Sequence, residues 1–137
     1  MRTNFQMSTS FTKKETEFLK SMEECRMATS HNDIPHVKPV SFVLYNNTIY
    51  IATDYDTRAF KNLKKNPKIA VSIDEYVSGA HRAVCVQGDT AILEKGKEFL
   101  EIYDVFYKKF EWVRNQPWKE NEAPFIKIIP TNKSSWV

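Results

Sequence analysis

The chain has 137 residues, of which 42% are hydrophobic, so its length fits one domain of ordinary size with a core of its own. The formal net charge of +3 is mild and concentrated in one short stretch, which argues against an extended nucleic-acid-binding face. No apolar run is long enough to cross a bilayer and no leader-like segment opens the chain, so we expect a cytoplasmic protein that binds neither membrane nor nucleic acid.

The first predicted element is a helix that begins after Thr12 and ends near Cys25. Thr12 and Glu15 have the spacing of a capping box, and the apolar residues that follow share one helical face. We expect a single domain over residues 1–137, with residues 1–10 forming a flexible extension before this helix.

Two hairpin turns are predicted next. The short mixed segment Arg26–Ser30 is followed by turn residues, and apolar and polar residues then alternate over His36–Tyr45. Asn46 and Asn47 separate this run from a strand over Thr48–Thr53, because paired asparagines tolerate the positive φ that a tight hairpin needs.

A short basic helix is predicted over Thr57–Asn66, where Pro67 ends it. Strands are expected over Lys68–Asp74 and Ala83–Leu93, and Gly88 in the second indicates a bulge or a close backbone approach. The cations of the helix region form one compact cluster: Arg58, Lys61, Lys64, Lys65 and Lys68.

The C-terminal third predicts one long helix and one strand. Aromatic residues spaced by threes and fours indicate an amphipathic helix over Lys95–Arg114. Phe125–Ile129 is expected as a strand that ends at Pro130, which leaves Thr131–Val137 as a tail. The element order, with strands joined mostly by short turns, predicts a mainly β, antiparallel barrel with flanking helices.

Two further patterns concern partners and thiols. Strands such as Phe42–Leu44 and Ile49–Ile51 are apolar on both faces, which indicates that a partner surface covers the barrel. Cys25 and Cys85 form no Cys-x-x-Cys pair, so we expect two buried thiols, no disulfide and no metal site.

Several segments together resemble the pyridoxamine 5′-phosphate oxidase-like FMN-binding split β-barrel family. They occur in the family's order, as Ala28-Thr29, Pro35–Val40, Thr53–Pro67 and Val86–Ala91. The resemblance implies an antiparallel split barrel of six or more strands. It also implies a homodimer with FMN bound at the interface between the two copies.

In such proteins the start of the short helix holds the flavin phosphate, which here implies Thr57, Arg58 and Lys61. A helix N-terminus offers unpaired N–H groups, and an arginine can grip phosphate oxygens bidentately. Many relatives carry a lysine directly after the arginine, whereas this chain has Ala59, so Lys61 or Lys64 would have to compensate. The alternative is that these cations are only the solvated face of an amphipathic helix.

The resemblance also implies that the strand Lys38–Ser41 lies under the flavin ring and that Trp136 reaches the flavin of the partner. Trp118 is the competing aromatic residue, although a packing role suits it better. His36 could act in acid–base chemistry, but a structural role is the more common one for a lone histidine. The full predicted cofactor-binding set is Lys38, Pro39, Val40, Ser41, Thr53, Thr57, Arg58, Lys61, Gln87 and Trp136.

No residue pattern identifies a catalytic nucleophile, and nothing after Pro130 matches the arginine-rich substrate motif of true pyridoxamine 5′-phosphate oxidases. The leading hypothesis is therefore an FMN-dependent oxidoreductase that passes hydride or electrons to a small, planar substrate. One alternative is a deazaflavin-dependent reductase. Another is a non-catalytic flavin- or haem-binding protein, in which His31, His36 or His81 would be candidate haem ligands. Nucleic-acid binding ranks last.

Overall fold

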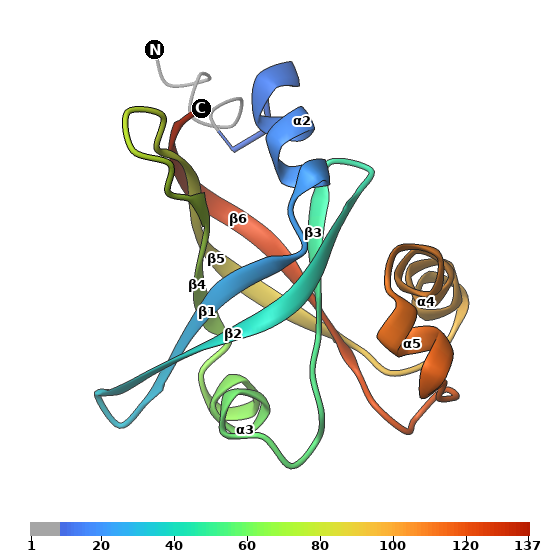
Figure 1. The fold of residues 1–137 in the computed structure, drawn as a ribbon. Coiled ribbons are helices and arrows are strands. Elements are labelled where there is room, and N and C mark those ends of the chain that lie inside the picture. Colours follow the sequence, from blue (N-terminus) through green and yellow to red (C-terminus); the bar gives the residue numbers. More distant parts are fainter. Residues whose placement is uncertain (1–8) are drawn as a thin grey trace.

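Six antiparallel strands close into a barrel in the computed structural model, which describes residues 9–137 (Figure 1). Their order around the barrel is β1-β2-β3-β6-β5-β4, and β1 pairs with β4 to close it. The predicted extension lies mostly outside the described residues, because residues 1–8 are not among them. The strands are β1 Glu24–His31, β2 Ile34–Tyr45, β3 Thr48–Ala52, β4 Lys68–Glu75, β5 Arg82–Leu93 and β6 Phe125–Trp136.

Within residues 9–137, four helices flank the barrel: α2 Lys13–Ser21, α3 Arg58–Lys65, α4 Lys97–Lys109 and α5 Glu111–Asn115. Helix α2 lies at the end of the barrel near the C-terminus, α3 lies at the opposite end, and α4 and α5 lie together beside it (Figure 1). In the described part of the chain, no helix has both the length and the apolar character that crossing a bilayer requires. The mainly β barrel predicted from the sequence is confirmed.

The residues predicted to start the first helix and to form the two hairpin turns adopt those structures. Thr12 and Glu15 form a complete capping box at the start of α2. Asn32 and Asn46 have φ of 51° and 50°, the left-handed conformation that both hairpin turns require.

The surface that covers the doubly apolar strands belongs to this same chain. Phe42 and Ile51 point into the barrel interior, where they join the main core. Val43 and Tyr50 point outward into a second core, with Phe99 and Phe106 of α4. The prediction that these strands imply a partner surface is therefore wrong for this part of the barrel, because α4 buries their outer faces.

Three element boundaries differ most from the predictions. Helix α2 ends at Ser21, and Cys25 belongs to β1, which begins at Glu24. The predicted long helix is interrupted at Phe110, whose extended backbone, with φ −115° and ψ 125°, separates α4 from α5. A prediction about the thiols also fails, because Cys85 is half-buried whereas the sequence predicted a buried thiol.

The third boundary concerns the C-terminal strand, which does not end at Pro130. Strand β6 continues to Trp136 and pairs with β5 along its whole length. A shift of register between Gln87 and Gly88 marks a bulge opposite this proline. Bulges are where a sheet tolerates a residue that has no N–H. The predicted tail, Thr131–Val137, is therefore mostly strand.

Gly88 permits the close approach of β5 and β6 at this bulge. A Cβ atom at this position would lie 2.2 Å from the carbonyl oxygen of Ile129. We expect Gly88→Ala to destabilise the fold by about 1–3 kcal/mol, because backbone atoms must move to relieve the overlap. Urea unfolding followed by circular dichroism measures this effect. An unchanged unfolding midpoint would show that the two strands can separate here without cost.

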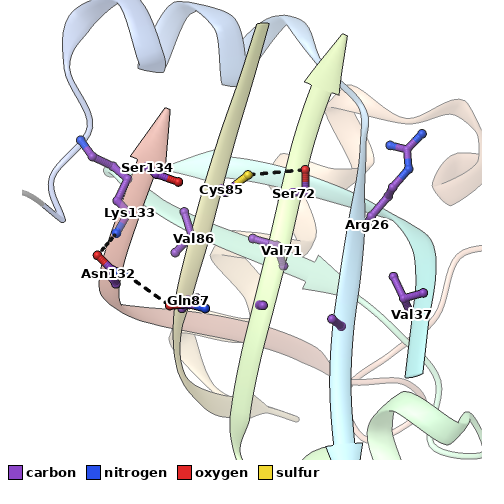
Figure 2. Close-up of a pocket in the computed structure, with 12 residues that line it drawn as sticks. Arg26, Val37, Val71, Ser72, Cys85, Val86, Gln87, Asn132, Lys133 and Ser134 are labelled. Atoms are coloured by element: carbon purple, nitrogen blue, oxygen red, sulfur yellow. Dashed lines mark hydrogen bonds between the residues drawn. The ribbon is translucent and has the colours of Figure 1, made fainter. Parts of the chain in front are cut away.

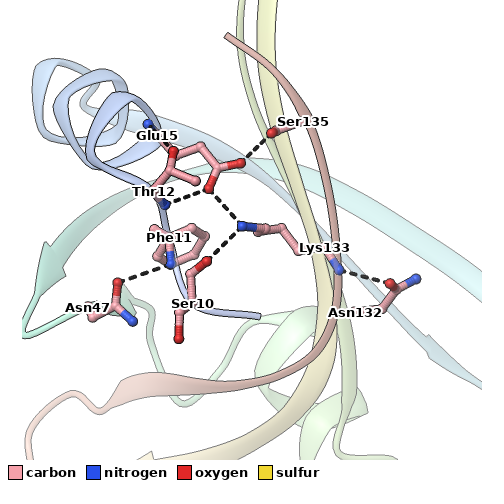
Figure 3. A network of polar contacts seen from close by, with 8 residues as sticks. All are labelled: Ser10, Phe11, Thr12, Glu15, Asn47, Asn132, Lys133 and Ser135. Atoms are coloured by element: carbon pink, nitrogen blue, oxygen red, sulfur yellow. Dashed lines mark hydrogen bonds and ion pairs between the residues drawn. The ribbon is translucent and has the colours of Figure 1, made fainter. Parts of the chain in front are cut away.

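A buried ion pair fastens α2 to β6 (Figure 3). Glu15 is only 3% exposed, and its carboxylate accepts hydrogen bonds from Lys133 Nζ at 2.7 Å, from the Thr12 N–H at 2.9 Å and from the Ser135 hydroxyl. Burial disfavours the charge, but these hydrogen bonds outweigh it and lower the pKa of Glu15. Lys133 also donates to the Ser10 carbonyl, so the network ties the start of α2 to the end of β6.

Candidate functional site

The barrel splits where β2 separates from β3. β2 pairs with β1 from Ile34 to Ser41, but its pairing with β3 begins only at Phe42, opposite Ile51. The segment Lys38–Ser41 therefore has a ladder partner on its β1 side and none on its β3 side among the described residues. Such an edge leaves backbone N–H and C=O groups free to bond a ligand.

Helix α3 begins close to this split. Thr57 is its N-cap, and the Thr57 hydroxyl accepts the Phe60 N–H at 3.2 Å while it donates to the Asp54 carbonyl at 2.9 Å. The hydroxyl oxygen of Thr53 lies 3.1 Å from that of Thr57. The Thr57 hydroxyl is therefore already engaged within the protein. The backbone N–H groups that open α3 remain as the donors for an anion at this helix end.

Two positively charged side chains of α3 are exposed to solvent near these N–H groups. Arg58 and Lys61 are exposed, and neither side chain has a hydrogen-bond or ion-pair partner within residues 9–137. Lys64 instead lies over the Phe60 ring, at 6.0 Å from its centroid. Ala59 is fully buried against the barrel. Lys61 is therefore better placed than Lys64 to serve as a second cation at this end of the helix.

The loop between β3 and α3 is held in place by a residue that directly follows β5. The Tyr55 hydroxyl donates to the Glu94 carboxylate at 2.9 Å, and the Tyr55 ring packs edge-on against Phe60. Burial and the bond to Glu94 raise the pKa of Tyr55 to about 12, so the phenol stays protonated and keeps donating at neutral pH. The start of α3 is thus fixed relative to the barrel.

A cavity of about 300 Å³ opens at the split itself. The cavity is bounded by Val40 and Ser41 of β2, by Thr53 at the end of β3, and by two tryptophans that follow α4 in the chain. The structure therefore brings three of the predicted cofactor residues to one hollow beside the N-terminus of α3. Its complete lining is Val40, Ser41, Ala52, Thr53, Asp54, Trp112, Gln116, Trp118, Glu122 and Ala123.

Two other predicted residues lie on a different face. Gln87 lines a cavity of about 470 Å³ on the outer surface of β1, β4, β5 and β6 (Figure 2). Its side-chain oxygen accepts from Asn132 Nδ2 at 3.3 Å. Trp136 is 50% exposed near the end of β6 and contacts the His81 ring edge-on, with centroids 5.9 Å apart. Neither residue lines the cavity at the β2–β3 split of its own chain.

The comparisons with known proteins agree with this geometry. The sequence profile of the family described as pyridoxamine 5′-phosphate oxidase matches residues 11–134. The chain belongs to the pyridoxamine 5′-phosphate oxidase family. None of the curated proteins matches the sequence.

Solved structures share the fold of this family member at low sequence identity. HutZ, the haem storage protein of Vibrio cholerae, has a TM-score of 0.75 at 15% identity and covers 88% of this chain and 89% of its own. An FAD-binding protein from Mesorhizobium loti has a TM-score of 0.70 at 21% identity, with 88% and 87% covered. An FAD-binding protein from Mycobacterium smegmatis has a TM-score of 0.66 at 16% identity, with 93% and 95% covered.

The histidines of this family member do not form a common site. His31 and His36 lie at the β1–β2 hairpin, and His81 lies between β4 and β5. Within the described residues, no three His, Cys, Asp or Glu side chains form a group that could hold a metal ion.

Sequence reasoning missed the residues that complete the cavity at the split. Trp118 packs in the second core, as predicted, but it also lines this cavity together with Trp112. Asp54 and Gln116 contribute its polar rim. These residues come from the β3–α3 loop and the α5 region, and only the closed barrel brings the two segments together. Two tryptophans six residues apart among polar residues were the available signal.

Proposed function

We propose that this chain binds FMN as a homodimer and transfers hydride or electrons between the flavin and a small planar substrate. The observation that carries the proposal is the free edge of β2 at Lys38–Ser41, next to a helix N-terminus with an unpaired arginine. An extended cofactor with a phosphate at one end and a polar ring at the other suits these two features. Membership of the family supports a cofactor of this kind.

The phosphate would bind at the start of α3. Arg58 supplies a guanidinium that needs no rearrangement to become available, and Lys61 supplies a second positive charge one turn along. The Thr57 hydroxyl serves as the N-cap and fixes the direction of the first N–H groups. The residues at this end of the helix therefore fit a phosphate without the lysine that Ala59 replaces.

The ring would lie along the open edge of β2. Backbone groups of Val40 and Ser41 would bond its polar edge, and the Lys38 ammonium would favour negative charge on it. A bound flavin supplies the hydride or electron chemistry. The side chains of this chain then bind and orient the reactants, so no protein nucleophile is required.

Dimerisation would bring Gln87 and Trp136 of a second copy to this edge. The outer face of the barrel that carries Gln87 has a floor of small residues, and the apolar side chain of Val37, at 65% exposure, lies at its margin (Figure 2). A face of this kind suits close contact between two copies. Ile129 on β6, which is 46% exposed, adds apolar surface.

We expect Val37→Lys to break the dimer, because it puts a charge within the proposed contact. Light scattering should give a dimer for the wild type and a monomer for the variant, together with weaker FMN binding. Leu100→Lys is the matched control, since Leu100 is 54% exposed on α4, away from this face. A wild-type monomer that binds FMN tightly would contradict the shared site.

Haem and deazaflavin are the competing cofactors. Histidines that ligate a metal usually donate their second ring N–H to an acceptor. The Nδ1 atom of His36 is buried and has no hydrogen-bond partner among the described residues, so this histidine lacks that support. A deazaflavin with a longer acidic tail would use more of the basic face of α3.

Titration of the purified protein with FMN, a deazaflavin and haem, followed by absorbance, tests the choice of cofactor. We expect one FMN per chain with the tightest binding of the three. Tighter binding of haem, with the absorbance of an axially ligated iron, would replace the proposed oxidoreductase by a haem-binding protein. Tighter binding of the deazaflavin would change the cofactor and keep the reaction class.

A further inference from the structure

We propose that Asn132 is a positioning residue, which holds the side-chain amide of Gln87 in one orientation and directs its NH2 group away from β6 as a hydrogen-bond donor. The group that Gln87 meets at the dimer contact is then a hydrogen-bond acceptor, such as a ring carbonyl of the flavin bound by the second copy. The identity of this acceptor rests on the proposed function. The orientation of Gln87 does not.

The bulge in the β5–β6 ladder places the two residues opposite each other. Asn132 pairs with Gln87, whereas on the other side of the bulge Pro130 pairs with Gly88. Thr131 is therefore the extra residue of β6, and without the bulge it would occupy the position opposite Gln87. Directly opposed side chains of an antiparallel pair lie on one face of the sheet. Figure 2 shows both amides on the face that carries the larger cavity.

Two hydrogen bonds fix the direction of both amides. Asn132 Oδ1 accepts the Lys133 backbone N–H at 2.9 Å, a bond that only the oxygen end of the amide can form. The nitrogen end of Asn132 therefore faces Gln87 and donates to its Oε1 at 3.3 Å. Because the Gln87 oxygen is bound on this side, its nitrogen points away from Asn132 (Figure 2).

This pair of bonds starts from a well-anchored part of the chain. The Lys133 ammonium belongs to the buried ion pair with Glu15, so the backbone N–H that Asn132 accepts lies in an ordered segment of β6. The Thr131 hydroxyl also donates to the Gln87 carbonyl at 3.3 Å. The backbone of Gln87 is thus held from the same strand as its side chain.

The free end of Gln87 lies over an open surface. Its Nε2 atom has no hydrogen-bond partner within residues 9–137. The residue opposite Gln87 on β4 is Ala70, whose short side chain leaves space above it. No Asp or Glu of the described chain lines this cavity, and its two cations, Arg26 and Lys133, are held in ion pairs. The N–H groups of Gln87 therefore remain available to an acceptor from outside this copy.

The direction of the amide matters for a flavin. The polar edge of the ring carries carbonyl and ring-nitrogen acceptors together with one N–H donor. A glutamine that turns freely would bond either kind of group, whereas one fixed as a donor bonds only the acceptors. Reduction adds electron density to these acceptors, and a donor bonds a more negative acceptor more strongly. Asn132 should therefore favour the reduced form of bound FMN over the oxidised form.

The orientation of Gln87 is tested first on FMN-free protein. In the wild type we expect nuclear Overhauser effects from the Gln87 Nε2 protons to the Ala70 methyl group to be stronger than those to protons of β6. Asn132→Ala should remove this preference. Both side chains are exposed, so the substitution should leave the fold intact. The same pattern of effects in the wild type and the variant would overturn the positioning role.

The consequence for the cofactor is tested by a double-mutant cycle on the FMN-loaded protein. We expect Asn132→Ala to lower the preference for reduced over oxidised FMN by about two- to tenfold, where tenfold corresponds to about 30 mV in the two-electron midpoint potential. In a Gln87→Ala background, the same substitution should change nothing. Ser134→Ala is the matched control, because Ser134 lies two residues along β6 and has no hydrogen bond to Gln87 within the described chain.

The outcomes separate this inference from the proposed function. An equal shift of the potential in both backgrounds would show that Asn132 does not act through Gln87, and the inference would fail while FMN binding stands. Failure of the wild type to bind FMN would remove the flavin as the acceptor together with the proposed function. The nuclear Overhauser effects would still decide whether Asn132 orients Gln87.

Discussion

Replacing Arg58 by alanine is expected to raise the dissociation constant of FMN by about 10- to 100-fold. A hydrogen bond between a charged donor and a phosphate contributes about 1.5–3 kcal/mol, and 1.4 kcal/mol corresponds to a factor of ten. Arg58 has no partner within residues 9–137, so its whole donor set is available to the phosphate. Flavin fluorescence quenching on titration with FMN measures the effect.

Two controls make this result specific to the phosphate. Lys65→Ala removes an exposed cation from the last turn of the same helix and should change FMN affinity by less than about twofold, because charge effects at a surface are screened. Riboflavin lacks the phosphate, so its affinity should be the same for the wild type and Arg58→Ala. An equal loss for riboflavin and FMN would move the phosphate away from α3.

Replacing Glu15 by glutamine is expected to lower the free energy of unfolding by about 3–5 kcal/mol. The change removes one charge of a buried pair and leaves Lys133, whose side chain is 11% exposed, without a carboxylate. Glu17→Gln, on the exposed side of the same helix, should have little effect. Urea unfolding of both variants measures the difference. A double variant that also carries Lys133→Met should recover part of the loss, because the unpaired buried charge is then gone.

The contribution of Glu15 to stability should also depend on pH. Its pKa is lower in the folded protein than in the unfolded chain, so folding favours the ionised form. The stabilisation is fully present above the unfolded pKa of about 4.3 and is lost as the pH falls through the lower, folded pKa. The stability difference between wild type and Glu15→Gln should therefore be constant near neutral pH and shrink in acid. A difference that grows on acidification would contradict the assigned ion pair.

Local chemistry made most of the fold predictable. The Thr12 capping box, the paired asparagines and Pro67 act within a few residues of the structure that they specify, and each lies where the sequence predicts. The same reasoning gave the wrong end for β6, because a proline such as Pro130 normally ends a strand. Strand β6 tolerates Pro130 because a bulge lies opposite Gly88 of β5. No local pattern in the β6 sequence indicates that bulge.

The candidate site was predictable in part, for the same reason. The resemblance identified Arg58 and the Lys38–Ser41 strand because both belong to contiguous motifs. The cavity at the split combines segments that are about 60 residues apart. No sequence pattern therefore indicates that Trp112 and Asp54 line the same cavity. Glu15 did leave a signal, because it lies three and four residues before Phe18 and Leu19, on their apolar face.

Strand β6 has a consequence for how the protein is made. Among the strands of residues 9–137, β6 alone pairs with both β3 and β5, so the barrel stays an open sheet until β6 has been synthesised. While the chain is still emerging from the ribosome, β3 and β5 both have exposed edges, and such edges invite pairing with other chains. The cavity at the split also needs residues 112–123, which are translated shortly before β6. Folding and assembly of the ligand site are therefore expected to be late, nearly simultaneous events in biosynthesis.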